Sequence, residues 1–461
     1  MATQPWQCSA SRLAEMIAKK EISSREVVES HLARIDEVNG KLNAITVVLA
    51  DSALEAADAA DRREPSGPLH GVPFTIKENI DCTGSATTEG VPLRVDAMPE
   101  MDAPVVERMK AAGGIPLART NLPEMGLRIS TDNPLRGLTL NPWNDALTAG
   151  GSSGGEASAL AAGMTPLGLG NDIGGSLRNP AFCCGITSLK PSPGRVPHAA
   201  CIPPTDGGIA WQVMAVQGPM ARHVEDVRLA YTVLSGRHVR DPESVDAPLQ
   251  GPACEKRAAL VSDLPGFDLP ESTRVAVRRA GEALAEQGFE VVEAQPPELE
   301  RVHEIWALLL SMDFEPMLPE LSQLMSEGPI ETLRLFFQRF PSSSVRLPDV
   351  HAERRRLSRL WSEFFQGFPI VVCPTWTDRQ FPHGADLNGE AGAELVSNTV
   401  RFITPANVLG LPAAAVPTGL HEDLPTGVQV YADRWRDDLA LEGAEAIESV
   451  LGHITPIDPV T

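Results

Sequence analysis

Two serines in glycine-rich segments, and one lysine upstream of them, are the residues of this chain whose types and spacing could perform chemistry. Ser152 lies in the run Gly150-Gly-Ser-Ser-Gly-Gly155, and Ser176 ends the run Gly170-Asn-Asp-Ile-Gly-Gly-Ser176. Lys77 precedes Ser152 by 75 residues, and Ser176 follows Ser152 by 24 residues. Glycines let backbone N–H groups approach a ligand closely. A serine beside such donors is typical of acyl transfer, in which an oxyanion must be stabilised.

The segments around these residues alternate between strand-like and helix-like patterns. The apolar run 72–76 leads into Lys77 and indicates a core strand, and residues 166–170 indicate a second strand that leads to Asp172. Residues 156–163 are small, which favours a helix packed closely on a sheet with its N-terminus at the Ser152 loop. This alternation predicts an α/β fold whose sheet is covered by helices on both faces.

Other elements extend this α/β pattern along the chain. Ser23 and Glu26 have the spacing of a capping box, which begins a helix whose C-cap we place at Gly40. The remaining predicted strands are 114–118, 257–262, 289–293, 368–373 and 413–416, and the remaining predicted helices are 51–63, 105–112, 272–287 and 438–451.

Residues 300–366 differ from the rest of the chain, because they are helical in pattern and rich in Trp and Phe. Proline interrupts this segment at Pro316, Pro319 and Pro341. It can be interpreted as an ordinary helical layer over the sheet or as a lid-like insertion over an active site. The sequence does not decide between these two interpretations.

Composition restricts the class of protein. The chain has 461 residues and a formal net charge of −22, whereas contacts with nucleic-acid phosphates need clustered Lys and Arg. No apolar run approaches the roughly 20 residues that cross a bilayer, and no signal peptide is visible. We therefore expect a cytoplasmic protein with a small-molecule substrate, no nucleic-acid partner and no membrane contact. Either a monomer or a homodimer is compatible with these features.

Cysteines and other metal-ligating residues show no ligand spacing. The seven cysteines are scattered and form no C-x-x-C pair, so neither a disulfide framework nor a zinc site is predicted. We expect no metal and no cofactor.

Several ordered segments give this chain a close resemblance to the amidase signature family of serine hydrolases. The resemblance implies one large domain over residues 1–461 with a mixed central β-sheet, and a signature core at about 65–235. It implies that Ser176 is the nucleophile, that Ser152 follows a cis peptide bond, and that Lys77 is the base. The matching segments are 69–84, 118–126, 150–158, 169–195, 218–222 and 411–413.

The chemistry of such a triad explains why these residue types are needed. A serine hydroxyl becomes a good nucleophile only when a base takes its proton. Burial disfavours the charged form of lysine, so a neutral Lys77 can act as that base. Ser152 can relay protons between Ser176 and Lys77 and return one to the leaving amine. The resemblance places the oxyanion hole at the backbone N–H groups of Ile173, Gly174, Gly175 and Ser176.

Four further residues are candidates for supporting roles. Ser153 is expected to supply hydrogen bonds within its loop, and Asp172 and Arg178 are expected to form an ion pair that holds the Ser176 loop. Met125 resembles a family position near the acyl pocket. The substrates implied are small or aryl amides, and esters and carbamates as well if the chain resembles the urethanase branch.

Alternative functions remain open at the level of sequence. Gly150–Gly154 also satisfies G-x-S-x-G, the nucleophile elbow of α/β-hydrolases, which would need a histidine such as His223, His303 or His383. A Cys–Glu–Lys amidase that uses Cys183 is compatible with residue types but has no motif. A phosphate-binding loop is excluded because no Gly-Lys-Ser/Thr follows the glycines. The family also includes the amidase component of glutamine-dependent tRNA amidotransferase, although the segment 121–132 lacks the sequence typical of that branch.

Overall fold

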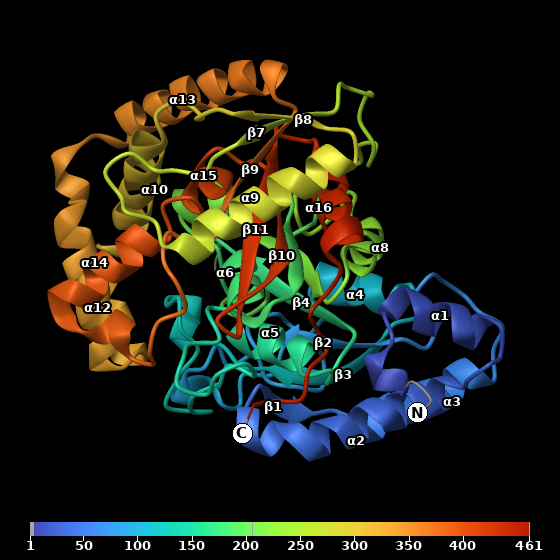
Figure 1. Cartoon of the computed structure of the whole chain (residues 1–461). Coiled ribbons are helices and arrows are strands. Elements are labelled where there is room, and N and C mark those ends of the chain that lie inside the picture. Colours follow the sequence, from blue (N-terminus) through green and yellow to red (C-terminus); the bar gives the residue numbers. More distant parts are fainter. Residues whose placement is uncertain (1–3, 205, 461) are drawn as a thin grey trace.

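The computed structural model describes residues 4–204 and 206–460, and its centre is one mixed sheet of eleven strands (Figure 1). The strands are β1 (Ile45–Val48), β2 (Pro73–Lys77), β3 (Ile115–Thr120), β4 (Leu167–Asp172), β5 (Thr187–Lys190), β6 (Val216–Ala221), β7 (Arg257–Leu260), β8 (Glu290–Glu293), β9 (Ile370–Pro374), β10 (Ala413–His421) and β11 (Leu424–Ala432). Their order across the sheet is β1-β3-β2-β4-β6-β5-β10-β11-β9-β7-β8.

The parallel part of this sheet brings the candidate lysine and the candidate nucleophile loop to one edge. Strand β2 pairs in parallel with both β3 and β4, with Ile76 opposite Leu169. Because the carboxyl ends of parallel strands lie at the same edge, Lys77 at the end of β2 lies near Asp172 at the end of β4. A second parallel group, β9-β7-β8, lies at the other end of the sheet, and all remaining neighbours are antiparallel.

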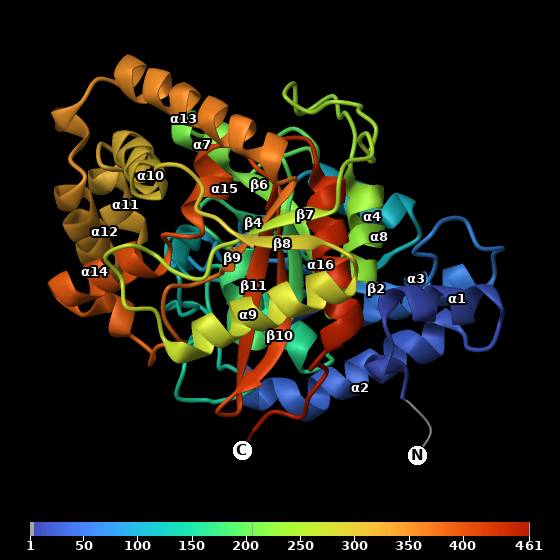
Figure 2. The ribbon, with the colours of Figure 1, turned by 45° about the horizontal axis from the view of Figure 1, so that its top comes forward.

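Helices cover both faces of the sheet, as the sequence predicted (Figure 2). The helices are α1 (Ala10–Ala18), α2 (Ser24–Leu42), α3 (Ala50–Asp61), α4 (Pro104–Ala111), α5 (Gly154–Ala161), α6 (Arg178–Cys184), α7 (Ile209–Met214), α8 (Val224–Leu234), α9 (Glu271–Glu286), α10 (Leu299–Phe314), α11 (Leu318–Leu324), α12 (Glu327–Arg339), α13 (Leu347–Gly367), α14 (Gly389–Thr399), α15 (Thr404–Val408) and α16 (Asp437–Leu451). One apolar core joins the sheet to α1, α4, α8, α9 and α16, and another joins it to α5, α6, α7, α10, α13 and α15. The predicted single-domain α/β fold is confirmed.

The first long helix begins where the sequence predicted and ends later. The capping box is present at its start, since Ser23 N donates to Glu26 Oε2 at 2.8 Å and Glu26 N donates to Ser23 Oγ at 3.1 Å. The prediction of Gly40 as the C-cap was wrong, because α2 continues through Gly40 to Leu42. Asn43 provides the left-handed cap with φ 50°, a conformation that asparagine tolerates.

The segment 300–366 divides into two parts that pack differently. Helices α10 and α13 contribute Trp306, Leu357 and Trp361 to a core that also contains residues of the sheet. Leu321 of α11, Ile330 of α12 and Met325 between them form a separate small cluster, against which Met125 packs. Helices α10, α12, α13 and α14 lie together at the left of Figure 1. Helix α12 also contributes Phe336 and Phe337 to the core that contains the sheet, so it links the layer over the sheet to the small cluster that lies against the turn containing Met125.

Candidate active site

Lys77 lies buried at the end of β2 with its amine held between two oxygen atoms. Nζ donates to Ser152 Oγ and to Asn171 Oδ1, both at 2.6 Å. Burial lowers the pKa of Lys77 to about 7, although the carboxyls of Asp172 and Glu156 act in the opposite direction. The amine is therefore able to change charge near neutral pH, and its neutral form has a lone pair that can accept the proton of Ser152.

The Ser152 loop is packed so closely that its glycines admit no side chain. The peptide bond between Gly151 and Ser152 is cis, as the resemblance implies. A Cβ on Gly151 would lie 2.7 Å from Arg128 O, and a Cβ on Gly126 would lie 3.3 Å from Ser152 Oγ. The hydroxyl of Ser152 is thus confined between the Gly126 turn and the lysine amine.

Ser176 lies in the loop that joins β4 to α6, and this loop contacts the Ser152 loop directly. Ser153 N donates to Ser176 O at 3.3 Å. Gly175 has φ +100°, and a Cβ there would lie 2.5 Å from Ile403 Cγ2, so only glycine fits. The fold therefore brings together the three residues for which the sequence predicted catalytic roles.

The predicted oxyanion donors differ in how their N–H groups are used. Gly175 N–H donates to Asp172 Oδ1 at 2.7 Å, so it is committed to that carboxylate. In residues 4–204 and 206–460, nothing accepts a hydrogen bond from the N–H of Gly174 or Ser176. The N–H of Ile173, which is half-buried beside them, likewise has no acceptor in these ranges. Ile173, Gly174 and Ser176 are thus the donors of this loop that a ligand oxygen can use.

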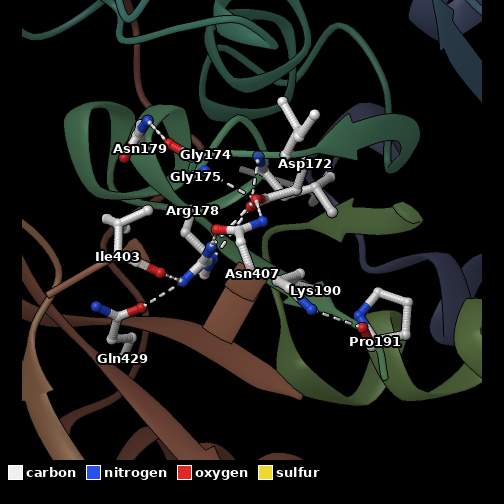
Figure 3. A network of polar contacts seen from close by, with 12 residues as sticks. Asp172, Gly174, Gly175, Arg178, Asn179, Lys190, Pro191, Ile403, Asn407 and Gln429 are labelled. Atoms are coloured by element: carbon white, nitrogen blue, oxygen red, sulfur yellow. Dashed lines mark hydrogen bonds and ion pairs between the residues drawn. The ribbon is translucent and has the colours of Figure 1, made fainter. Parts of the chain in front are cut away.

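Asp172 and Arg178 form a fully buried ion pair behind the loop (Figure 3). The carboxylate accepts from Arg178 Nε and Nη2 at 3.1 Å each and from Asn407 Nδ2 at 2.8 Å. Burial alone would raise the pKa of Asp172, but the Arg178 guanidinium brings it down to about 2. Arg178 Nη1 donates in turn to Ile403 O and Gln429 Oε1. The pair ties the nucleophile loop to α15 and β11.

Ser153 and Met125, the other two predicted residues, lie close to the triad in different ways. The Ser153 hydroxyl is buried and has no hydrogen-bond partner in the described residues, so this residue contributes through its backbone N–H to Ser176 O and not through its side chain. Met125 has φ 54° in the turn Glu124–Gly126, beside Ser152. Its side chain packs against the small cluster of Leu321, Met325 and Ile330.

Asn179 connects the two serine loops and was not among the residues predicted from the sequence. Its Nδ2 donates to Gly151 O at 3.3 Å and to Gly174 O at 3.2 Å. Its backbone N donates to Gly175 O at 2.6 Å. Trp376 Nε1 donates to Asn179 Oδ1 at 2.7 Å, which fixes the orientation of the amide. Its position three residues after Ser176 is a signal that could have identified it.

A buried carboxyl, Glu156, lies close enough to Lys77 for its charge to affect the amine, and it was also not predicted as a site residue. Its carboxyl accepts from the hydroxyl of Thr75 and, at 2.8 Å, from Thr120 Oγ1. Burial raises the pKa of Glu156 to about 8. Where this carboxyl is neutral it adds no negative charge beside Lys77, and where it is ionised its charge favours the protonated amine.

Neither alternative nucleophile has the partners it needs. The bond to Ser152 Oγ comes from a lysine, whereas His303 bonds Thr404 and Ser397, and His383 bonds Asp145 O. His223, the third candidate, packs against His453 with ring centroids 4.4 Å apart. Among residues 4–204 and 206–460, the nucleophile-elbow interpretation therefore lacks its histidine. Cys183 is fully buried, and burial raises the pKa of its thiol, which makes it a poor nucleophile.

Two further structural findings bear on metals and membranes. Across 4–204 and 206–460, no three His, Cys, Asp or Glu side chains are grouped so that they could hold a metal ion. In the same ranges, no helix combines the length and the apolar character that a membrane span requires.

Comparison with known proteins decides the family. A model of the amidase family matches residues 26–441. This chain belongs to the amidase family. The indoleacetamide hydrolase of Bradyrhizobium diazoefficiens is 40% identical, over 97% of this chain and 88% of that protein. A glutamyl-tRNA(Gln) amidotransferase component from Salinispora tropica is 31% identical, over 97% of this chain and 98% of that protein.

A solved amidase structure shows the same fold. The 6-aminohexanoate cyclic dimer hydrolase in complex with its substrate superposes with a TM-score of 0.85 at 28% identity, covering 98% of this chain and 99% of that one. The predicted membership of the amidase signature family is confirmed, and with it the predicted class of enzyme, a hydrolase of amide C–N bonds.

Proposed function

We propose that this amidase hydrolyses small neutral amides with an apolar or aryl acyl group, through an acyl-enzyme formed on Ser176. The observation that carries the proposal is the fully buried Lys77 amine, 2.6 Å from Ser152 Oγ and with a pKa of about 7. An amine with this pKa takes up and releases protons at neutral pH, as a catalytic base must.

The reaction follows from the order of these groups. Ser176 Oγ attacks the amide carbon while its proton moves to Ser152 Oγ and the proton of Ser152 moves to Lys77 Nζ. When the C–N bond breaks, the same relay returns a proton to the departing nitrogen, so that a neutral amine or ammonia leaves. Water then attacks the ester on Ser176, and the carboxylic acid and the free serine are restored. Asn171 Oδ1 holds the lysine amine in place throughout.

The negative charge of each tetrahedral intermediate needs donors that are already in place. In this proposal the N–H groups of Ile173, Gly174 and Ser176 supply them, because the N–H of Gly175 is occupied by Asp172.

The surroundings of the loop support an apolar acyl group. Trp306 lies against Gly174, Ile403 lies against Gly175, and Met125 belongs to an apolar cluster. Arg128, whose carbonyl touches Gly151, has its guanidinium bound by both oxygens of Asp386 at 2.9 and 3.1 Å. This cation is neutralised within the protein and is therefore a poor partner for a substrate carboxylate. The 40% identical relative is named for indoleacetamide, a neutral aryl amide.

We therefore expect purified protein to release ammonia from indole-3-acetamide with a kcat/KM at least about 100-fold above that for glutamine. The α-carboxylate and ammonium of glutamine would enter an apolar site without partners, which costs several kcal/mol. Ammonia release measures both rates, with Ser176→Ala protein as the blank. Glutamine turnover equal to that of indole-3-acetamide, or turnover that appears only with partner proteins, would instead favour the amidotransferase function.

Anilides, aryl esters and phenyl carbamates belong in the same experiment. Each gives an acyl or carbamoyl group on Ser176 by the same steps, so we propose that they are turned over as well. Their relative rates show whether the chain resembles the urethanase branch. A rate on the carbamate above that on indole-3-acetamide would shift the proposed substrate class to carbamates.

Asn179→Ala is expected to lower kcat about 10- to 100-fold. The substitution leaves the carbonyls of Gly151 and Gly174 without their donor and loosens both serine loops. Each unsatisfied buried group also costs about 1–3 kcal/mol of stability, so the thermal midpoint should fall.

Asn141→Ala is the matched control for this prediction. Asn141 is equally buried, and its Nδ2 donates to Thr148 O and Cys183 O, both at 2.9 Å. The two variants should lose similar stability, but only Asn179→Ala should lose activity per folded molecule. Equal loss of activity in both would assign Asn179 a purely structural role.

A further inference from the structure

Trp306 of α10 contacts two consecutive residues of the nucleophile loop. Its Nε1 donates to Ile173 O at 3.0 Å, and a Cβ on Gly174 would lie 2.8 Å from its Cζ2. The side chain is 5% exposed. A helix more than 100 residues away in the sequence thus provides a hydrogen bond to the loop that ends in Ser176.

This hydrogen bond acts on one peptide unit. The C=O of Ile173 and the N–H of Gly174 belong to the same peptide group, and in a trans peptide they point in opposite directions. The cis bonds among the described residues precede Ser152, Pro203 and Pro456, so this unit is trans. Anchoring the oxygen at Trp306 therefore aims the Gly174 N–H away from α10.

The loop needs such an anchor because of its composition. Gly174 and Gly175 lack the side chains that restrict backbone rotation, so their peptide planes turn at little intrinsic cost. The two following units are anchored from Asn179, at Gly174 O and Gly175 O. The unit between Ile173 and Gly174 is the one that depends on Trp306.

We propose that Trp306 is a positioning residue that aims the Gly174 N–H at the oxyanion of the substrate. The proposal rests on the function proposed above, in which this N–H is an oxyanion donor. It assigns to α10, the first helix of the 300–366 segment, a part in the reaction without contact with the reacting atoms.

The indole is itself held in place by its neighbours. His303, one turn earlier on α10, stacks on Trp306 with ring centroids 5.7 Å apart. Its two ring nitrogens lie 3.3 Å from Thr404 Oγ1 and 3.2 Å from Ser397 Oγ. Phe336 of α12 meets the indole edge-on at 5.9 Å. Burial lowers the pKa of His303 to about 3, so the stacked ring stays neutral over the working pH range.

Trp306→Phe tests the proposal, because it removes the N–H and keeps an aromatic ring. Removal of a whole oxyanion donor costs about 100- to 1,000-fold in kcat, so a donor that is no longer aimed should cost about 10-fold or more. KM for indole-3-acetamide should change by less than about threefold, since the bond acts on the transition state. A kcat within about twofold of wild type would overturn the proposal.

Trp361→Phe is the matched control. Trp361 is fully buried in α13, and its Nε1 also donates to a backbone carbonyl, Pro297 O, at 2.8 Å. It should lower the thermal midpoint about as much as Trp306→Phe and leave kcat within about twofold. Parallel losses of kcat in the two variants would show that Trp306 is structural only, which would also overturn the proposal.

A second readout separates this proposal from the proposed substrate. The rate at which a fluorophosphonate labels Ser176 depends on stabilisation of the phosphoryl oxygen by the same donors, and it needs no amide. We expect Trp306→Phe to slow labelling about 10-fold and Trp361→Phe to leave it unchanged. If wild type hydrolyses no amide but shows this labelling pattern, the proposed function fails and the role of Trp306 holds. Labelling at the wild-type rate in Trp306→Phe would contradict that role.

Discussion

Replacing Ser176 with alanine is expected to reduce kcat on indole-3-acetamide to less than about one hundredth of the wild-type value. This loss corresponds to at least about 2.7 kcal/mol of activation free energy. Without the hydroxyl no acyl-enzyme can form, and only binding and oxyanion stabilisation remain. The fold should persist, because Ser176 contacts the Ser152 loop through its backbone carbonyl, which alanine retains. Ammonia release and the thermal midpoint measure the two effects.

Ser158→Ala is the control for the loss of a buried serine hydroxyl near these loops. Ser158 lies in α5, one helical turn beyond the glycines of the Ser152 loop. Its Oγ donates to Leu140 O at 2.9 Å. We expect a loss of about 1 kcal/mol of stability from this hydrogen bond and little change in kcat. A fluorophosphonate should label Ser176 in wild type and in Ser158→Ala, and it should not label Ser176→Ala.

Two outcomes would contradict the assignment of Ser176. Activity of Ser176→Ala above the one-hundredth level would show that another group forms the covalent bond. Label found on Ser152 in the wild-type protein would make Ser152 the nucleophile. In that case the 2.6 Å bond from Lys77 to Ser152 Oγ would represent direct activation and not a relay.

Local sequence was sufficient for the elements that carry the triad. The apolar run before Lys77 and the run before Asp172 became strands β2 and β4, as their patterns predicted. Their parallel pairing is a finding of the structure. The small residues 156–163 became α5, which begins two residues earlier, at the glycines of the Ser152 loop. In each of these segments, hydrophobic pattern and glycine content agree with the tertiary structure, so a local signal was enough.

The strands in the middle of the sheet escaped prediction because their residues are atypical of strands. In β5, Thr187, Ser188 and Lys190 are buried polar residues, so no alternation of apolar and polar positions is visible. In β6, Gly218 and Pro219 would ordinarily argue against a central strand. These two strands are specified by pairing with their neighbours, which the sequence alone does not display.

The supporting part of the candidate site was beyond sequence reasoning for a different reason. Asn407 and Gln429 contact the Asp172–Arg178 pair from more than 200 residues away, and Trp306 contacts Ile173 from 133 residues away. Neither an asparagine in a short helix nor a tryptophan in an amphipathic one carries a local signal. Asn171 and Asn179 lie beside the nucleophile and could have been proposed from their position in its motif.

The activity should rise with pH because Lys77 must be neutral to accept a proton. Burial lowers the pKa of this amine to about 7. We expect kcat/KM to rise about tenfold per pH unit below that value, where the protonated form dominates, and to level off above it. A profile that falls with increasing pH between 5 and 7 would contradict a neutral lysine base.

Two carboxyls affect this ionisation. Asp172, with a pKa of about 2, stays ionised over the whole range and only shifts the midpoint. Glu156, with a pKa raised by burial to about 8, ionises above the lysine, and its negative charge then favours the protonated amine. The pKa values seen in the pH profile therefore belong to Lys77 and Glu156 as a coupled pair. Glu156→Gln removes one of the two ionisations and should leave a single rising limb.

Lys77→Ala should lower kcat/KM on an amide by about 100- to 10,000-fold, the range that general acid–base catalysis provides. On an ester with the same acyl group the loss should be at least about tenfold smaller. An alkoxide or phenolate can leave without a proton from the relay, whereas an amine must be protonated as it leaves. Matched aryl amide and ester substrates measure both losses in one protein preparation.

Lys77→Arg separates basicity from charge at this position. A guanidinium stays protonated and cannot accept a proton from Ser152, so this variant should be as inactive on the amide as Lys77→Ala. If Lys77→Arg retains activity, the positive charge of the residue matters and its lone pair does not. Equal losses on amide and ester in Lys77→Ala would contradict a role of Lys77 in protonating the leaving group. The relay would then only activate Ser176. A large loss on the amide, a smaller one on the ester and no rescue by arginine together require a neutral amine that both takes and returns the proton.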